Sequence, residues 1–346
     1  MKVTAVTVTP FAGGCVVELL TDVGLTGIGV GAAGTEATIK AVVNDVVIGA
    51  DPRSVTGLWQ RIVDTHEHRR ARPCEDALAA VDIALWDLKA KANDEPLWKT
   101  LGSARPHANA HASCLDPTLQ DAALLDWFAA MARDYGMRAG KLRVGSDQAV
   151  DLQRIERMHA ALARATTQPT LIVDADQQWS PKQAIRRLRE IEERFDLACV
   201  EAVARTWDVH GSKQVSNAIR GAVCVGHGLA SLAEFLPHFQ HRSADIVQID
   251  IGATGITTAL QLADAAFGYE LPVTLSAVPG NIHAHLAGAM PYFMSLEVVD
   301  PVPSTQLYST DVWIEQGRAV VGDEPGHGLV VNHEALAAAT RSLEPR

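Results

Sequence analysis

The middle of the chain repeats a short apolar run that ends in a polar side chain. The runs are rich in β-branched and aliphatic residues and are too short for ordinary helices, which is typical of fully buried strands. Four of them, spaced by about 25 residues as suits one strand plus one helix, are Leu171–Asp174, Ala198–Glu201, Ala222–His227 and Asp245–Asp250. The pattern therefore predicts a (β/α) barrel whose strand ends meet at a single mouth.

The same alternation of strand and helix continues on both sides of these runs. Residues 313–321 have the pattern of one further short strand after the barrel. We expect the other barrel strands near 110–114 and over 139–145, 271–278 and 293–299, with helices over 117–135 and 147–165.

The first hundred residues have a different pattern. Residues 2–32 alternate between apolar and polar positions around a turn signal at Thr21–Gly24, which predicts a small antiparallel sheet. Helical periodicity follows over 35–47 and 52–68, and the clearest helix of the chain spans 75–91. A sheet followed by helices predicts an α+β domain that precedes the barrel.

Composition narrows the class of protein. The 346 residues carry 30 Lys and Arg against 41 Asp and Glu, a net charge of −11, which argues against nucleic acid or an anionic membrane as a partner. Five scattered cysteines without Cys-x-x-Cys spacing indicate reduced thiols, and Cys199 and Cys224 fit a packed core. No signal-peptide pattern and no membrane-length apolar run is visible, so we expect a cytoplasmic protein.

Three consecutive predicted strands end in possible metal ligands, Asp174, Glu201 and His227. Two carboxylates and an imidazole can hold one divalent cation. Oxygen ligands suit Mg²⁺, whereas an imidazole favours Mn²⁺, Fe²⁺ or Zn²⁺. The alternative is that these residues cap their strands by bonding to loop amides.

Two cations, Lys141 and Arg143, face the same mouth from the strand over 139–145. They can bind a substrate carboxylate, and a lysine that has lost its proton can act as a base. Alternatively they pair with Asp174 and Glu201. Asp250 ends a strand across the barrel from Lys141, where it is a base, orients one, or pairs with a cation.

Together these motifs resemble the enolase superfamily, in the branch of mandelate racemase and muconate lactonizing enzyme. The resemblance implies an α/β fold, a modified (β/α)7β TIM-type barrel at 110–305. An α+β capping domain would be formed by N-terminal and C-terminal segments, 1–109 and 306–346. It also implies a homo-oligomer, a dimer or an octamer. The similar segments are Thr21–Gly27, Ala79–Lys89, Lys141–Arg143, Asp174–Trp179, Glu201, Asp245–Asp250 and Gly255–Thr257.

The family reaction removes the proton α to the carboxylate of a small substrate, and Mg²⁺ stabilises the resulting enediolate. Glu297 matches the family and is expected to bond to the enediolate or to the substrate carboxylate. Asp176 stands where the family has Asn, which adds a carboxylate near the metal. This carboxylate either replaces a lost catalytic acid or base, or supplies charge to a softer cation.

Three further positions depart from the family pattern. His227 replaces the usual third Glu ligand, which leaves Mn²⁺ and Zn²⁺ as alternatives to Mg²⁺. Arg143 replaces the usual lysine base and is a poor base itself. The segment Thr274–Gly280 lacks the usual histidine, so Asp250 has no obvious partner unless His283 folds back to it.

These features favour a metal-dependent lyase that dehydrates a hydroxy acid, in particular an acid sugar, because Asp250 in place of Lys resembles the dehydratase and mandelate-type branch. A racemase or epimerase needs two competent bases on opposite faces of the substrate. The third hypothesis is a catalytically silent member of the family.

Overall fold

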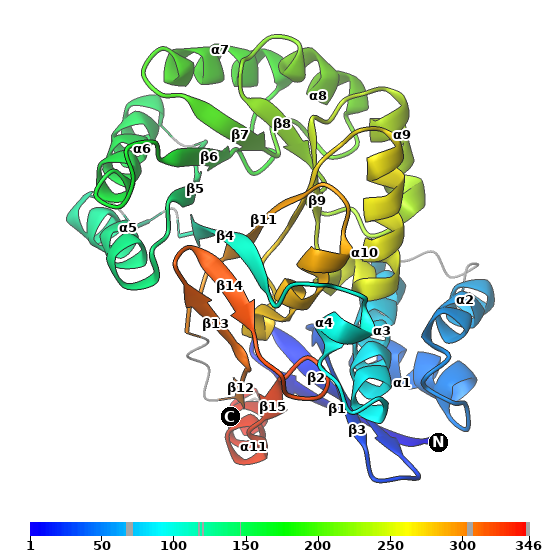
Figure 1. Ribbon diagram of the computed structural model, residues 1–346. Coiled ribbons are helices and arrows are strands. Elements are labelled where there is room, and N and C mark those ends of the chain that lie inside the picture. Colours follow the sequence, from blue (N-terminus) through cyan, green and yellow to red (C-terminus); the bar gives the residue numbers. More distant parts are fainter. Residues whose placement is uncertain (67–71, 117, 120, 146, 303–306, 344–346) are drawn as a thin grey trace.

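The computed structural model describes residues 1–346 except 67–71, 117, 120, 146, 303–306 and 344–346. In the described chain eight parallel strands pair in chain order, and the last pairs back with the first, which closes a barrel (Figure 1). The strands are β4 (His107–Cys114), β5 (Ala139–Arg143), β6 (Thr170–Asp174), β7 (Leu197–Glu201), β8 (Ala222–Val225), β9 (Ile246–Ile249), β10 (Val273–Leu275) and β11 (Phe293–Val298).

Helices surround this barrel (Figure 1). Several begin at a side chain that accepts hydrogen bonds from the first backbone N–H groups, as Asp147, Asp208 and Asp250 do. Such caps place each helix directly after a strand end. The helices are α5 (Asp121–Tyr135), α6 (Gln148–Leu162), α7 (Pro181–Glu192), α8 (Val209–Ser216), α9 (Leu232–Gln240), α10 (Ile251–Gly268) and the 3₁₀ segment Pro279–Ala289.

An α+β cap precedes the barrel, as predicted. Its three strands form an antiparallel sheet in the order β1-β2-β3. Helix α3 is buried nearly all round because it packs against both β3 and α10. A Cβ atom at Gly29 would lie 2.1 Å from the Ala80 carbonyl oxygen, so only glycine allows this close packing. The elements are β1 (Val3–Phe11), β2 (Gly14–Thr21), β3 (Thr26–Ala32), α1 (Glu36–Val42), a π-helical turn (Val43–Val47), α2 (Val55–His66), α3 (Arg72–Ala92) and α4 (Leu97–Thr100).

The C-terminal segment returns to this cap. The single strand predicted over 313–321 is wrong, because Gln316 and Gly317 take positive φ angles of 51° and 73° and turn the chain into a hairpin. His327 then fixes the segment to the cap, since its Nε2 donates to the Ile28 carbonyl at 2.8 Å. The elements are β12 (Tyr308–Ser309), β13 (Val312–Glu315), β14 (Arg318–Val321), β15 (Val330–Val331) and α11 (His333–Arg341).

The predicted fold class is therefore confirmed, with the barrel and the cap both present. The domain boundaries stay predictions, and the one between 305 and 306 lies outside the described residues. Within the described helices, none combines the length and the apolarity needed to cross a bilayer.

A buried carboxylate joins the cap to the barrel. Asp82 of α3 is 1% exposed and accepts hydrogen bonds from Thr257 N at 2.7 Å and Thr257 Oγ1 at 2.6 Å. Trp86 Nε1 donates to the same hydroxyl. Burial raises the pKa of Asp82 to about 6, although the Thr257 bonds oppose the shift.

This pKa predicts a pH-dependent effect of Asp82→Asn. Between the ordinary pKa of 3.8 and about 6, the unfolded chain has lost a proton that the folded protein keeps. The contribution of Asp82 to the unfolding free energy therefore falls as pH rises through this window, by about 3 kcal/mol. We expect the stability of the Asn variant relative to the native protein to improve by that amount from pH 4 to 7 in urea unfolding.

The matched control is Asp126→Asn, because Asp126 lies on an exposed helix face. Its relative stability should change much less over the same range. If Asp82→Asn behaved like this control, the burial of Asp82 would not govern its ionisation.

Candidate functional site

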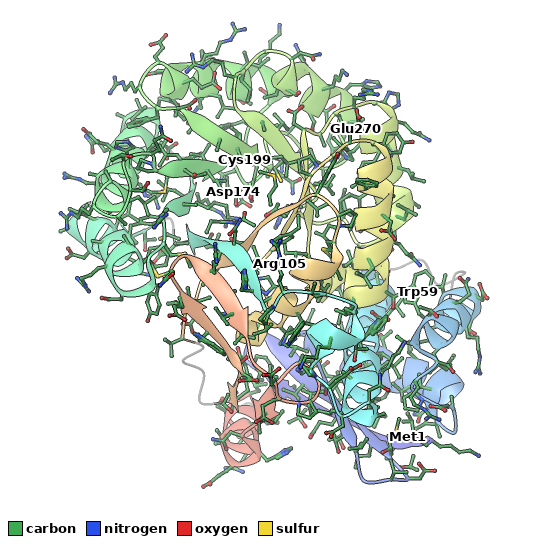
Figure 2. All side chains as sticks on the ribbon, viewed as in Figure 1. Met1, Trp59, Arg105, Asp174, Cys199 and Glu270 are labelled. Atoms are coloured by element: carbon green, nitrogen blue, oxygen red, sulfur yellow. The ribbon has the colours of Figure 1, made fainter. Side chains whose placement is uncertain are left out.

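The carboxyl ends of β5, β6 and β7 bring charged side chains into one row. Arg143 and Asp174 are register partners, and Asp174 is in turn the register partner of Glu201. Asp174 lies in the central region of the barrel in Figure 2. It is 7% exposed and Glu201 is 4% exposed, so both carboxylates need compensating charge.

Lys141 provides part of that charge. Its Nζ lies 2.7 Å from Glu201 Oε2 and 2.7 Å from Glu297 Oε1, and the side chain is buried. Burial alone would lower the pKa of Lys141, but Glu201 and Glu297 outweigh it and raise the pKa above its usual range. Lys141 is therefore an ammonium ion that links β5 to β7 and β11.

Arg143 pairs with the neighbouring acids. Its guanidinium lies 3.5 Å from Asp174 Oδ2 and 3.4 Å from Asp176 Oδ2. Asp176 N donates to Asp174 Oδ1 at 2.8 Å, which holds the two acids together. The structure therefore contains the pairing of Lys141 and Arg143 with the strand-end carboxylates, and a role of the two cations in the reaction stays a prediction.

The structure does not bring the three expected metal ligands, Asp174, Glu201 and His227, into one group. In the part of the chain that is described, the one group of three His, Cys, Asp or Glu side chains with ligand atoms within 4.8 Å of one another is Cys199, Glu201 and Cys224. His227 is exposed, and its carbonyl oxygen accepts a hydrogen bond from Thr206 Oγ1. Asp174 and Glu201 are register partners on adjacent strands, but neither Asp174 nor His227 belongs to this group of three.

The oxygen donors present still fit a hard divalent cation. In the described chain, both hydrogen bonds to Glu201 are accepted by Oε2, from Lys141 and from Gln248 Nε2 at 2.8 Å, which leaves Oε1 for another ligand. Asp174, Asp176, Glu201 and Glu297 carry four negative charges against the two positive charges of the paired cations. The excess is that of one divalent ion, and Mg²⁺ is commonly held by one or two carboxylates.

Asp250 lies on the other side of the mouth. It directly follows β9 and caps α10, where its Oδ1 accepts a hydrogen bond from Gly252 N at 2.8 Å. Burial raises the pKa of Asp250, Glu297 adds to the shift, and His227 opposes it. His283 does not fold back to Asp250, because its Nε2 donates to the Glu297 carbonyl at 3.0 Å.

Two polar residues of the barrel interior were missed by sequence reasoning. Gln248 binds Glu201, and its place two residues before Asp250 was a usable signal, since alternate strand residues share a face. His111 is the register partner of Glu297 and bonds through Nδ1 to Ser295 Oγ at 3.0 Å. Burial lowers the pKa of His111 to about 3, so its imidazole is neutral.

Comparison with known proteins covers nearly the whole chain. A family model described as mandelate racemase / muconate lactonizing enzyme, N-terminal domain, matches residues 1–102. A second, described as enolase C-terminal domain-like, matches residues 123–335. Together they cover both the cap and the barrel.

The relatives that match this chain are named for different activities. L-talarate/galactarate dehydratase of Salmonella typhimurium is 27% identical over 317 residues, 88% of this chain and 75% of that protein. L-Ala-D/L-Glu epimerase of Clostridium acetobutylicum is 27% identical over 334 residues, 91% and 90% of the two chains. The solved structure of L-talarate dehydratase from Polaromonas sp. JS666, complexed with Mg and L-glucarate, has a TM-score of 0.82 at 27% identity, and the match covers 97% of this chain and 96% of that one.

Proposed function

Because this chain belongs to the mandelate racemase and muconate lactonizing enzyme branch of the enolase superfamily, we propose that it is an enzyme that removes the proton α to the carboxylate of a small hydroxy acid and then expels the β-hydroxyl as water. Relatives named as acid-sugar dehydratases support this reaction. The substrate we propose is an acid sugar.

A divalent cation belongs to this proposal, with Mg²⁺ as the first choice because two solved relatives contain it. Asp174 and Glu201 would hold it, and it would supply positive charge against the charge that develops on the substrate carboxylate. Lys141 and Arg143 add two fixed cations that bind and orient the same carboxylate. His227 as a third ligand, with Mn²⁺ or Zn²⁺, remains the alternative.

The arrangement of the two cations on β5 is the observation that favours dehydration over racemisation. Racemisation removes a proton from one face of the substrate and returns it to the other, which needs two bases. On the β5 side Lys141 is held between two carboxylates, and Arg143 cannot give up its proton at neutral pH. One face of the substrate is therefore left without a base.

Asp250 is the base that remains across the mouth. Its carboxylate takes the α-proton as the C–H bond breaks, and the resulting acid can give that proton to the leaving β-hydroxyl. The C–O bond then breaks, water leaves, and the enol becomes a 2-keto acid. A single residue suffices for both proton transfers because both occur on one side of the substrate.

The experiment that tests this reaction is incubation in D₂O with Mg²⁺ and a panel of acid sugars, other hydroxy acids and dipeptides, followed by ¹H NMR. Loss of the α-proton signal with formation of a 2-keto acid supports the dehydratase. Uptake of deuterium without loss of water supports the second candidate, an epimerase, for which the relative from Clostridium acetobutylicum gives the precedent. No exchange with any compound, with Mg²⁺ or with Mn²⁺, would support a silent protein.

The role of His227 is tested by metal binding. We expect His227→Ala to change Mg²⁺ affinity by less than about threefold, because His227 is exposed and is not grouped with the proposed ligand Glu201. Glu201→Gln should weaken binding by more than about tenfold, because it removes a charged ligand oxygen. Isothermal titration with Mg²⁺ measures both. A tenfold loss in His227→Ala would establish the histidine as a ligand.

A further inference from the structure

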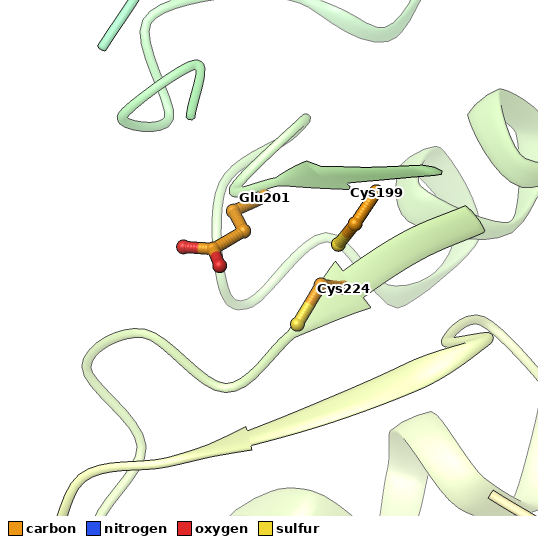
Figure 3. A group of neighbouring side chains, drawn as sticks. All are labelled: Cys199, Glu201 and Cys224. Carbon is orange, nitrogen blue, oxygen red and sulfur yellow. The ribbon is translucent and has the colours of Figure 1, made fainter. Parts of the chain in front are cut away.

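Two thiols lie directly beneath the mouth of the barrel. Cys199 is 6% exposed and Cys224 is 1% exposed. Cys224 is the register partner of Glu201, and Cys199 lies two residues before Glu201 on β7, so all three side chains face the barrel interior. Figure 3 shows the Cys199 sulfur beside the Glu201 carboxylate and the Cys224 sulfur below it. Their ligand atoms all lie within 4.8 Å of one another.

The surroundings of the two thiols suit a soft metal ion better than a hard, hydrated one. Ile172 and Ile246 pack against the two cysteines and form an apolar floor. In a tetrahedral zinc site with Zn–S bonds of about 2.3 Å, two sulfurs stand roughly 3.8 Å apart, which is within the spacing of this cluster. Thiolates select Zn²⁺ and related ions over Mg²⁺.

A bound ion would also offset most of the charge that its ligands carry. Two thiolates and the Glu201 carboxylate bring three negative charges, and a divalent ion neutralises two of them. Lys141 lies next to the site, with its Nζ 2.7 Å from both Glu201 and Glu297, and is shared between these two carboxylates.

We propose that Cys199, Cys224 and Glu201 form a binding site for a thiophilic divalent cation such as Zn²⁺ or Cd²⁺, which overlaps the site of the hard cation at the mouth because both use Glu201. On binding, two S–H bonds break, two metal–sulfur bonds form and two protons pass to solvent. Glu201 completes the site from above. The soft cation therefore competes for Glu201 with Lys141 and with Mg²⁺, and it inhibits whichever reaction the mouth performs.

Cadmium is the probe for the test, because thiolate-to-cadmium charge transfer gives an ultraviolet band that requires no turnover. With excess Mg²⁺ present, the native protein should take up one Cd²⁺, show this band and release two protons. Cys199→Ala and Cys224→Ala should each abolish tight uptake. Cys114→Ala, which removes a buried thiol from β4, should leave uptake unchanged.

A second measurement avoids dependence on the folding of the variants. In the native protein, bound Cd²⁺ should protect Cys199 and Cys224 from alkylation during a short denaturant pulse, while Cys15 and Cys114 react as before. The absence of the band at stoichiometric Cd²⁺, or its retention in the double alanine variant, would overturn the proposal. Neither readout depends on the proposed dehydration, so the two ideas fail separately.

Discussion

Exchange of the substrate α-proton should fall by about 10³-fold or more when Asp250 is replaced by Asn, because an amide cannot accept the proton. The variant is well matched to the native protein. Asn keeps a side-chain oxygen that can accept the hydrogen bond from Gly252 N, so the N-terminus of α10 stays capped. The exchange rate should therefore fall without any loss of stability.

The measurement is the rate of α-proton loss by NMR in D₂O, with a substrate from the panel, beside thermal unfolding of the same samples. Asp264→Asn, on an exposed position of α10, is the control and should exchange at the native rate. Exchange by Asp250→Asn within tenfold of the native rate would mean that another group is the base.

Replacement of Lys141 by Met should cost about 3–5 kcal/mol of unfolding free energy at neutral pH, because it leaves Glu201 and Glu297 buried without their shared cation. Activity should be lost as well, since the clamp on the substrate carboxylate is removed. Denaturant unfolding measures the first effect. Lys40→Met, at an exposed position of α1, should change stability by less than about 0.5 kcal/mol.

The effect of Lys141→Met should also depend on pH. Burial alone would raise the pKa of Glu297, but Lys141 outweighs it and the pKa falls to about 2, from an ordinary value of 4.5. Glu297 therefore stabilises the folded native protein above pH 4.5, and this contribution is lost as pH falls towards 2. The difference between variant and native protein should shrink over the same range. Adding Glu297→Gln to Lys141→Met should recover part of the lost stability. A double variant that is less stable than Lys141→Met alone would contradict the pairing of Lys141 with Glu297.

The features that the sequence predicted are those set by local patterns. Asp174 and Glu201 were found because a carboxylate that follows a buried apolar run must lie at an exposed strand end or have a partner. The cap was found from its change of periodicity. Cys199 and Cys224 were expected in the core and are buried there, but their closeness to Glu201 depends on the register between β7 and β8.

Other features depend on the closed barrel and have no local signal. Lys141 reaches Glu297 because the last barrel strand, β11, pairs back with the first, β4. The residues that this closure brings together are far apart in sequence: His111 and Ser295, which share a hydrogen bond, are separated by 184 residues. The position of His227 follows from Gly226, whose φ of 148° turns the chain as it leaves β8. A Cβ at Gly226 would lie 1.9 Å from the Gln248 carbonyl oxygen, so this turn requires glycine. His227, predicted as a metal ligand from its place in the motif, is thereby directed to the surface.

The central claim is that the base acts from one side of the mouth only, and the configuration of recovered substrate tests it most directly. After partial conversion of an acid sugar in D₂O with Mg²⁺, the account predicts a 2-keto acid and unreacted substrate that keeps its original configuration at the α-carbon. Recovered substrate with deuterium at an inverted α-carbon would show that a second base acts from the β5 side, and it would contradict the account.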